Sequence, residues 1–353
     1  MYTIYDYLKY YKDYDINEVP WNDMDNLLLS TIVYIPIKGF MGTISFNEMC
    51  NKIMKFKVPD KTEYLAPKIK SLIEIINNSK RYNKLKFRNF ENTIDNNTQF
   101  GAMTCIIDKI KIIVFKGTDR SIVGWLENFR LMYEYPTYTQ SLAIKYLKNN
   151  IGLFDKNVYV TGHSKGGNMA MASVMELGDF KFNKVKRVIN FDGPGFRKEE
   201  YDSPKYKKMS MKLTNIIPSN SYIGSLMFNN EYKVIKTIAH GINIHYPIYW
   251  ATYGTEFIQD ELSKLSQELH IRTSINIENI DSNSFREYFE NAFKILNYKI
   301  TSNISISISD MINIFKTIKG MDKKTTEYVN SVLKSMLKIT NKNKWGRKYD
   351  RYY

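Results

Sequence analysis

An apolar stretch, a glycine-rich turn and a helix-type segment follow one another between residues 157 and 177. Residues 157–161 contain two valines and a tyrosine, which predicts a short buried strand. Residues 167–177 are rich in Ala, Met and Asn, a composition typical of a helix. Between the two, residues 162–166 (Gly-His-Ser-Lys-Gly) match the pattern G-x-S-x-G. Strand, sharp turn and helix are the context that a nucleophile elbow requires, with Ser164 at its tip.

The residue types in this turn have a physical reason. A serine at the tip sits in strained backbone, and flanking glycines remove the Cβ atoms that would clash where strand and helix approach. The hydroxyl then faces the helix N-terminus, whose free N–H groups can hold a developing oxyanion. The alternative is a glycine-rich β–α turn in which Ser164 only caps the helix.

Buried strands alternate with helices around this turn. Residues 112–115 (Ile-Ile-Val-Phe) form a continuous apolar run, the mark of a strand covered on both faces. Residues 100–107 are predicted to pair with it in a hairpin that turns near Asp108. The other elements expected here are an edge strand at 85–92, strands at 185–191, 209–217 and 232–237, and a helix at 139–149. The alternation predicts an α/β fold of the α/β-hydrolase type, with a mostly parallel sheet flanked by helices.

Both ends of the chain are predicted to be helical. Residues 1–35, 41–56 and 68–78 carry apolar residues at helical spacing, and Ser45 is placed to cap the second of these segments. Beyond residue 256, further apolar stripes predict helices at 285–296, 311–318 and 328–336. We therefore expect a hydrolase domain over residues 1–255, N-terminal helices included, and a helical extension over residues 256–353 packed on the core.

The composition allows a large buried core, because the chain has 353 residues of which 43% are hydrophobic. The formal net charge of +15 favours anionic partners. The lysines are spread along the chain without a long basic run, so a solvated surface explains them better than a dedicated polyanion site. This surface would suit peripheral contact with an anionic membrane, and no nucleic-acid partner is expected.

The expected compartment is the cytoplasm. Two isolated cysteines, Cys50 and Cys105, fit a reducing environment rather than a disulfide framework. Residues 1–15 lack the apolar run of a signal peptide, and no stretch approaches 18 uninterrupted apolar residues. Neither a metal nor a cofactor is expected, because His and Cys do not cluster and no phosphate-binding loop motif is present.

Histidine is scarce, which narrows the choice of a general base. His163 adjoins the serine and is expected on the other side of the turn, and His270 lies in the helical extension. His240 and His245 both follow the last predicted strand, where α/β-hydrolases place the base. His245 is the preferred base, because it is expected on a loop just before a helix that starts near Pro247.

The carboxylate partner is less narrowly defined. Asp192 ends the strand after the elbow helix, at the carboxyl edge of the sheet where ligand sites form. Asp202 lies further on in a polar loop, and the next strand ends at residues 218–221 (Pro-Ser-Asn-Ser) without a carboxylate. Asp192 is therefore the preferred acid, and its alternative role is a turn-forming residue before Gly-Pro.

The oxyanion hole needs two N–H donors. One should be the backbone N–H of Lys165, the residue after the nucleophile. The other should come from the loop after an earlier strand, and the N–H of Thr118 or Asp119 is the candidate because both follow the strand that ends at residue 115.

Several blocks, taken in order, resemble the class-three lipases: residues 115–118 (Phe-Lys-Gly-Thr), 125–129 (Trp-Leu-Glu-Asn-Phe) and 162–166. The chain is more similar to an uncharacterised bacterial branch of that superfamily, the Mbeg-like α/β-hydrolase domain, which is a domain of unknown function. The marks of this branch are residues 162–168 (Gly-His-Ser-Lys-Gly-Gly-Asn), 191–196 (Phe-Asp-Gly-Pro-Gly-Phe), 221–224 (Ser-Tyr-Ile-Gly) and 245–250 (His-Tyr-Pro-Ile-Tyr-Trp). The resemblance covers roughly residues 1–255 and implies hydrolysis of carboxylic esters.

Carried over to this chain, the resemblance implies Ser164 as nucleophile, His245 as base and Thr118 as an oxyanion donor. It departs at the acid, because Ser221 occupies the slot where class-three lipases have an Asp. Either Asp192 serves from the preceding strand, or the site is a Ser-His dyad. The sequence thus predicts a serine hydrolase acting on small-molecule or lipid esters, with a non-catalytic binding or scaffold protein on the same fold as the alternative.

Overall fold

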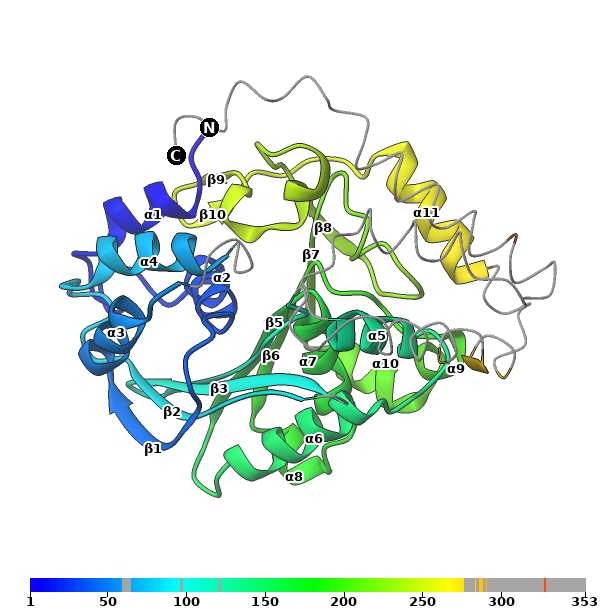
Figure 1. Cartoon of the computed structure of the whole chain (residues 1–353), viewed down its shortest axis with the longest axis horizontal. Helices are drawn as coiled ribbons and strands as arrows, with labels where there is room; N and C mark the ends of the chain where they lie inside the picture. Colours follow the sequence, from blue (N-terminus) through cyan, green and yellow to red (C-terminus); the bar gives the residue numbers. More distant parts are fainter. Residues whose placement is uncertain are drawn as a thin grey trace.

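The computed structural model describes residues 1–58, 65–95, 98–119 and 122–275, together with the single positions 283, 286, 287, 290 and 327. Within these residues, one eight-stranded sheet has its strands in chain order (Figure 1). They are β1 (Phe40–Ser45), β2 (Lys86–Ile94), β3 (Gln99–Ile107), β4 (Ile110–Phe115), β5 (Asn157–His163), β6 (Val185–Phe191), β7 (Leu213–Pro218) and β8 (Tyr232–Ile235). A separate hairpin joins β9 (Thr252–Tyr253) and β10 (Glu256–Phe257).

The pairing of neighbouring strands changes from antiparallel to parallel at β4. The first four strands are antiparallel neighbours, and β3 and β4 form the predicted hairpin, with Ala102 opposite Phe115. From β4 to β8 every neighbouring pair is parallel. The carboxyl ends of β4 to β8 therefore meet along one edge, where ligand sites form in such sheets.

Helices cover both faces of the sheet. They are α1 (Ile4–Tyr11), α2 (Asp23–Ile32), α3 (Phe46–Lys55), α4 (Leu65–Ile76), α5 (Ile122–Arg130), α6 (Tyr138–Asn150), α7 (Lys165–Met175), α8 (Asp179–Phe182), α9 (Lys198–Tyr201), α10 (Pro204–Ser210) and α11 (Lys264–Ile275), with 3-10 turns η1 (Gly241–His245) and η2 (Pro247–Tyr249). Among the described residues, no helix is both long and apolar enough to span a membrane.

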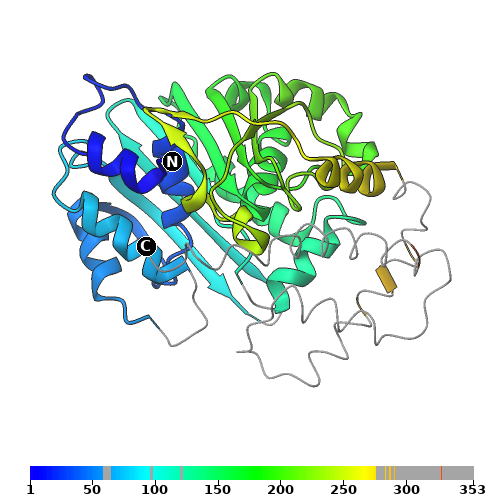
Figure 2. The same cartoon turned by 90° about the horizontal axis from the view of Figure 1, so that it is seen from above.

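Two apolar cores lie on opposite sides of the sheet. The first packs the N-terminal helices, through residues such as Leu28 and Ile69, against Ile112. The second packs α6 and α7, through residues such as Met171, against Ile113. Figures 1 and 2 show the blue N-terminal helices and the green helices on opposite sides of the strands. Successive residues of β4 thus enter different cores, which confirms the prediction from its continuous apolar run. The fold is the predicted α/β-hydrolase type.

Three predictions about the strands were wrong. Residues 41–45 belong to β1 instead of a helix, which begins only after Ser45, whose hydroxyl accepts the Glu48 N–H at 3.2 Å. Because β1 pairs with β2, the strand predicted at 85–92 is not an edge strand. The strand predicted from residue 209 begins only at Leu213. Residues 209 and 210 belong to the short helix α10, which Ser203 caps at its N-terminus.

The predicted helical extension is described only in part. Residues 256–275 contribute β10 and α11. The helices expected at 285–296, 311–318 and 328–336 lie outside the continuously described residues. The division of the chain near residue 255 therefore stays a prediction.

Candidate active site

Ser164 lies at the turn between β5 and α7. Its φ of 59° and ψ of −134° place a non-glycine residue in the left-handed half of backbone space, where side chains are strained. The Ser164 N–H donates to the Phe191 carbonyl oxygen at 2.9 Å, which ties the turn to the end of β6. The predicted sequence of strand, sharp turn and helix is confirmed.

The glycines around the turn allow three backbone segments to approach. A methyl group on Gly162 would lie 2.3 Å from the Gly166 carbonyl carbon, and one on Gly166 would lie 2.2 Å from the Phe115 oxygen. Both distances are far inside van der Waals contact. Any side chain at these two positions would therefore push α7 away from β4 and β5 and open the turn.

Asp192 and His245 form a short hydrogen bond. Asp192 follows β6, adopts a φ of 51° and is fully buried. Its Oδ2 lies 2.6 Å from His245 Nδ1. The structure thus brings together the two side chains that the sequence nominated as acid and base, at the sheet edge that also carries Ser164.

The second carboxylate oxygen of Asp192 has its own donors. Oδ1 accepts the Ser221 hydroxyl at 2.5 Å and the Gly224 N–H at 3.0 Å. Ser221 is fully buried and lies in the loop after β7. Ser221, which stands where class-three lipases have an Asp, is therefore in direct contact with Asp192, the preferred acid.

His245 lies in a 3-10 turn that neighbouring side chains hold in place. It ends η1, so the prediction that it lies outside any regular element was wrong, and the expected helix after it is only the turn η2. Tyr222 Oη donates to the Ile242 carbonyl at 2.9 Å, and Trp250 Nε1 donates to the Ile244 carbonyl at 3.0 Å. These bonds fix the turn that presents the imidazole.

His163 supports this turn from the other side. Its Nε2 lies 2.8 Å from the His245 carbonyl oxygen, so this nitrogen carries the proton and donates. Its Nδ1 is then the acceptor and receives the Tyr34 hydroxyl at 2.9 Å. With both ring nitrogens occupied, His163 is no candidate base, as the sequence predicted, although its ring centroid lies 4.3 Å from that of His245.

Burial sets the protonation of these groups. It raises the pKa of Asp192 to about 7, against the lowering effect of the Ser221 hydrogen bond. It lowers the pKa of His245 to about 3, and it lowers the pKa of His163 to about 3 with a further contribution from His245. Above pH 7 the pair therefore consists of a carboxylate and a neutral imidazole whose Nδ1–H donates to it. Nε2 is left unprotonated, as a general base requires.

Hydrogen bonds of His245 do not extend to the serine. In the described part of the chain, its side chain and carbonyl bond to Asp192 and His163, and none of these contacts reaches Ser164. In unliganded sites such contacts are often long and tighten when substrate binds.

The expected oxyanion donors flank Ser164. Lys165 is the first residue of α7, so its N–H belongs to the first turn, whose N–H groups have no partner within the helix. A methyl group on Gly117 would lie 3.0 Å from Ser164 Cβ, so the chain segment that leads into Thr118 runs directly past the serine. The Thr118 hydroxyl donates to Asn128 Oδ1 at 2.9 Å, which anchors this segment to α5.

The Lys165 side chain has a separate role from its backbone. It is buried, and its Nζ lies 2.7 Å from Glu127 Oε2 and 2.9 Å from both the carbonyl oxygen and the side-chain oxygen of Gln99. Its charge is thereby neutralised beneath α5. Glu127 and Asn128 both belong to the block at residues 125–129, which was the sequence signal for their place in the site.

The other sequence candidates do not join this cluster. His240 is exposed before η1, and Asp202 is exposed at the end of α9. His270 Nδ1 lies 3.2 Å from the Ser225 carbonyl oxygen, in α11. Tyr34 was missed altogether, because nothing in residues 30–36 signals that this side chain reaches His163.

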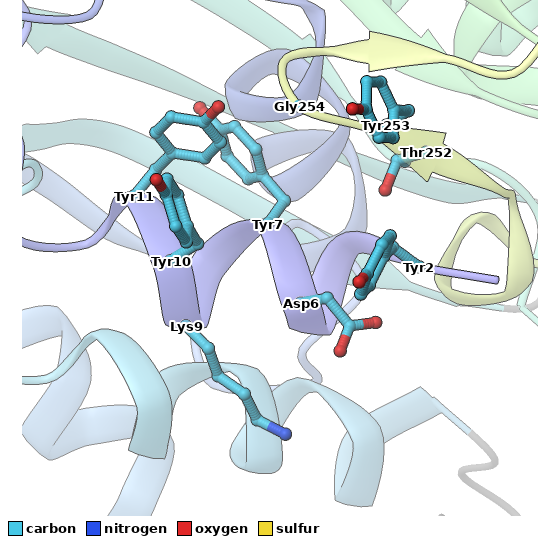
Figure 3. Close-up of a pocket in the computed structure, with 9 residues that line it drawn as sticks. All are labelled: Tyr2, Asp6, Tyr7, Lys9, Tyr10, Tyr11, Thr252, Tyr253 and Gly254. Atoms are coloured by element: carbon cyan, nitrogen blue, oxygen red, sulfur yellow. The ribbon is translucent and has the colours of Figure 1, made fainter.

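Among the described residues, no group of His, Cys, Asp or Glu side chains could hold a metal ion. A separate hollow of about 530 Å³ lies between α1 and the β9–β10 hairpin (Figure 3). It is lined by Tyr2, Asp6, Tyr7, Lys9, Tyr10, Tyr11, Thr252, Tyr253 and Gly254. None of the elbow, acid or base residues takes part in it.

A model of the Mbeg1-like family matches residues 76–294, a segment that contains Ser164, Asp192 and His245. Among solved structures, the chain is similar to the crystal structure of M37 lipase, with TM-score 0.36 and 15% identity over 57% of this chain and 69% of that one. It is also similar to the native Rhizomucor miehei lipase propeptide complex, with TM-score 0.32 and 14% identity over 60% of this chain and 66% of that one. No curated protein matches. Because the family model covers more than half of its length, the chain belongs to the Mbeg1-like family.

Proposed function

We propose that this protein is a serine hydrolase that cleaves carboxylic esters, with Ser164 as nucleophile, His245 as general base and Asp192 as the orienting acid. The observation that carries the proposal is the 2.6 Å hydrogen bond between the buried Asp192 carboxylate and His245 Nδ1, on the sheet edge where strained Ser164 lies. The order Ser, Asp, His along the chain is the order that α/β-hydrolases use.

The contacts support a definite sequence of steps. His245 Nε2 takes the Ser164 proton as the hydroxyl oxygen attacks the ester carbonyl, and Asp192 stabilises the imidazolium that forms. The N–H groups of Lys165 and Thr118 are the proposed donors to the oxyanion. His245 then returns the proton to the leaving alcohol, and water hydrolyses the acyl-enzyme by the same steps.

A triad explains the site better than a dyad. The Asp192 carboxylate is fully buried. Within the described part of the chain it has three hydrogen-bond partners, and of these His245 alone can become a cation in the reaction. A carboxylate in this position lowers the cost of forming the imidazolium, which a Ser-His dyad would lack.

The substrate class is proposed from charge. A net charge of +15 favours anionic surfaces, so lipid acyl esters presented on an anionic membrane are the proposed substrates, alongside small soluble esters. A screen of p-nitrophenyl esters and anionic and zwitterionic phospholipids on purified protein would test this. Equal rates on anionic and zwitterionic vesicles would contradict the charge argument.

A fluorophosphonate probe tests the nucleophile directly. We expect the probe to label wild type and His240→Ala, whose side chain is exposed outside the cluster, and not to label Ser164→Ala. The alternative, a non-catalytic binding protein on this fold, is favoured only by the lack of a hydrogen bond between Ser164 and His245. Folded wild type that stays unlabelled would establish that alternative.

A further inference from the structure

We propose that Ser221 is a positioning residue for Asp192: its hydroxyl, together with the Gly224 N–H, holds Oδ1 so that Oδ2 is presented to His245. The inference rests on the proposed function and extends the site from three residues to four. Asp192 is fully buried, so each of its oxygens depends on protein donors.

The two oxygens of the carboxylate have separate tasks. Oδ2 accepts from His245 Nδ1, while Oδ1 accepts from Ser221 and Gly224. The χ2 torsion of an aspartate is broad and roughly two-fold, so the side chain alone does not choose a rotation of its carboxylate. The donors to Oδ1 make that choice, and they thereby aim Oδ2 at the imidazole.

The Ser221 hydroxyl both donates and accepts in this loop. Its oxygen accepts from the Gly224 N–H at 2.9 Å, and this one N–H is shared with Asp192 Oδ1 at 3.0 Å. The Ser221 proton itself points at Asp192 Oδ1. Its backbone is fixed as well, because the Ser221 N–H donates to the Pro218 carbonyl oxygen at 2.9 Å and its own carbonyl accepts the Ser225 hydroxyl at 2.9 Å. The donor is thus preorganised by the loop that follows β7.

Gly224 belongs to the same device. A methyl group at this position would lie 2.4 Å from Asp192 Oδ1 and 2.6 Å from Ile217 Cγ2. Only glycine allows the amide to reach the carboxylate. This gives a physical reason why serine and glycine stand three positions apart in the block at residues 221–224.

Among the described residues, four other titratable groups interact with Asp192. His245 on η1 and His163 on β5 both have a pKa lowered to about 3 by burial. Burial also raises the pKa of Tyr222 and of Tyr232, so these phenols stay protonated. Asp192 is therefore the group of this cluster whose charge changes near neutral pH. Its Ser221 hydrogen bond favours the charged form against the effect of burial.

Ser221→Ala removes that donor, so the proton should bind Asp192 more tightly. We expect the acid limb of the kcat/KM profile for a p-nitrophenyl ester to move up by about one pH unit, the size of one charge-assisted hydrogen bond. The rate should fall about tenfold below pH 7 and converge with wild type at high pH. Ser221→Cys, which keeps a weak S–H donor, should give an intermediate shift, and it serves also if the alanine variant does not fold.

Ser173→Ala is the matched control. Ser173 is a fully buried serine whose hydroxyl, among the residues that the structure describes, bonds to the Ala170 carbonyl oxygen within α7 and to nothing in the Asp192 cluster. Its variant should leave the pH profile unchanged. A profile for Ser221→Ala that equals wild type, or that drops equally at every pH, would overturn the proposal, because loss of a direct donor to the Asp192 carboxylate must move the midpoint at which that carboxylate ionises.

A readout without turnover separates this inference from the proposed function. In 15N NMR of the wild type, the His245 resonances should report the ionisation of Asp192 near pH 7, and in Ser221→Ala that midpoint should move upward. If the wild type hydrolyses no ester but shows this difference, the proposed function fails and Ser221 still positions Asp192. If the midpoint is the same in both proteins, the inference fails whether or not the wild type is active.

Discussion

Two fully buried carboxylates, Asp25 and Asp192, differ in what neutralises them. The Asp25 carboxylate accepts two hydrogen bonds from Arg81, one from Nε at 2.8 Å and one from Nη2 at 2.5 Å. It also accepts hydrogen bonds from the hydroxyl groups of Tyr7 and Tyr82. A guanidinium stays charged at any relevant pH, so the Asp25 carboxylate lies against a permanent cation. Asp192 faces a histidine, a serine and a glycine amide, none of which carries a permanent charge.

The difference separates a structural carboxylate from a reactive one. The Asp25 cluster joins α1, α2 and the segment before β2, far along the chain from the elbow. Burial without a permanent cation leaves Asp192 with a pKa near neutral pH and a partner that can accept a proton. Chemistry is expected only at the second site, and substitutions should divide accordingly into effects on stability and effects on rate.

The largest expected effect is on the rate of Asp192→Asn. The amide would favour the wrong tautomer of His245, and kcat should fall by about 10⁴-fold, as the same change does in a serine-protease triad. The melting temperature should change little, because the substitution preserves shape and removes a buried charge. Steady-state kinetics on an ester and calorimetry on the same sample measure both. A loss of less than tenfold would mean that the site works as a dyad.

The next largest effect should appear in stability. Arg81→Met leaves the Asp25 charge buried and unpaired, which costs about 3–5 kcal/mol of unfolding free energy. Urea denaturation measures this loss. The neighbouring Lys80→Met, which breaks a half-exposed pair with Glu18, is the control and should show no measurable change. Fluorophosphonate labelling per folded molecule should be unaffected in both variants. A loss of labelling in Arg81→Met would contradict the assignment of a purely structural role to Asp25.

The pH dependence sharpens the same comparison. Because burial raises the pKa of Asp192 to about 7, its carboxyl is neutral below that pH and cannot stabilise the His245 imidazolium. We expect kcat/KM to rise with pH through a midpoint near 7 and then to level off. A stopped-flow or plate assay over pH 5–9 tests this. A flat profile would show that Asp192 is already ionised at pH 5 and that burial does not govern it.

Some of this site could be predicted from sequence, and the reason lies in local patterns. The elbow is contiguous, so its glycines and the apolar run before Ser164 define it without the fold. Asp192 and His245 were predictable because parallel strands bring their carboxyl ends to one edge. Ser221 was visible only as a missing carboxylate, since its contact with Asp192 depends on how two loops cross. Glu127 could be connected with the elbow only through the block at residues 125–129. No pattern in the sequence indicates that Tyr34 approaches the elbow.

The smallest effect is expected at Tyr34, the outermost contact on the base side. Tyr34→Phe removes the hydroxyl that donates to His163 Nδ1 and that also lies 3.2 Å from the His163 carbonyl oxygen. It leaves intact the His163 donation to the His245 carbonyl oxygen. Because one neutral hydrogen bond contributes about 0.5–1.5 kcal/mol, kcat/KM should fall about threefold to tenfold at all pH values, without a change in midpoint. This uniform loss contrasts with the midpoint shift expected for Ser221→Ala. A midpoint that moves in Tyr34→Phe would mean that His163 also controls the charge of Asp192, and that the two sides of the imidazole are coupled.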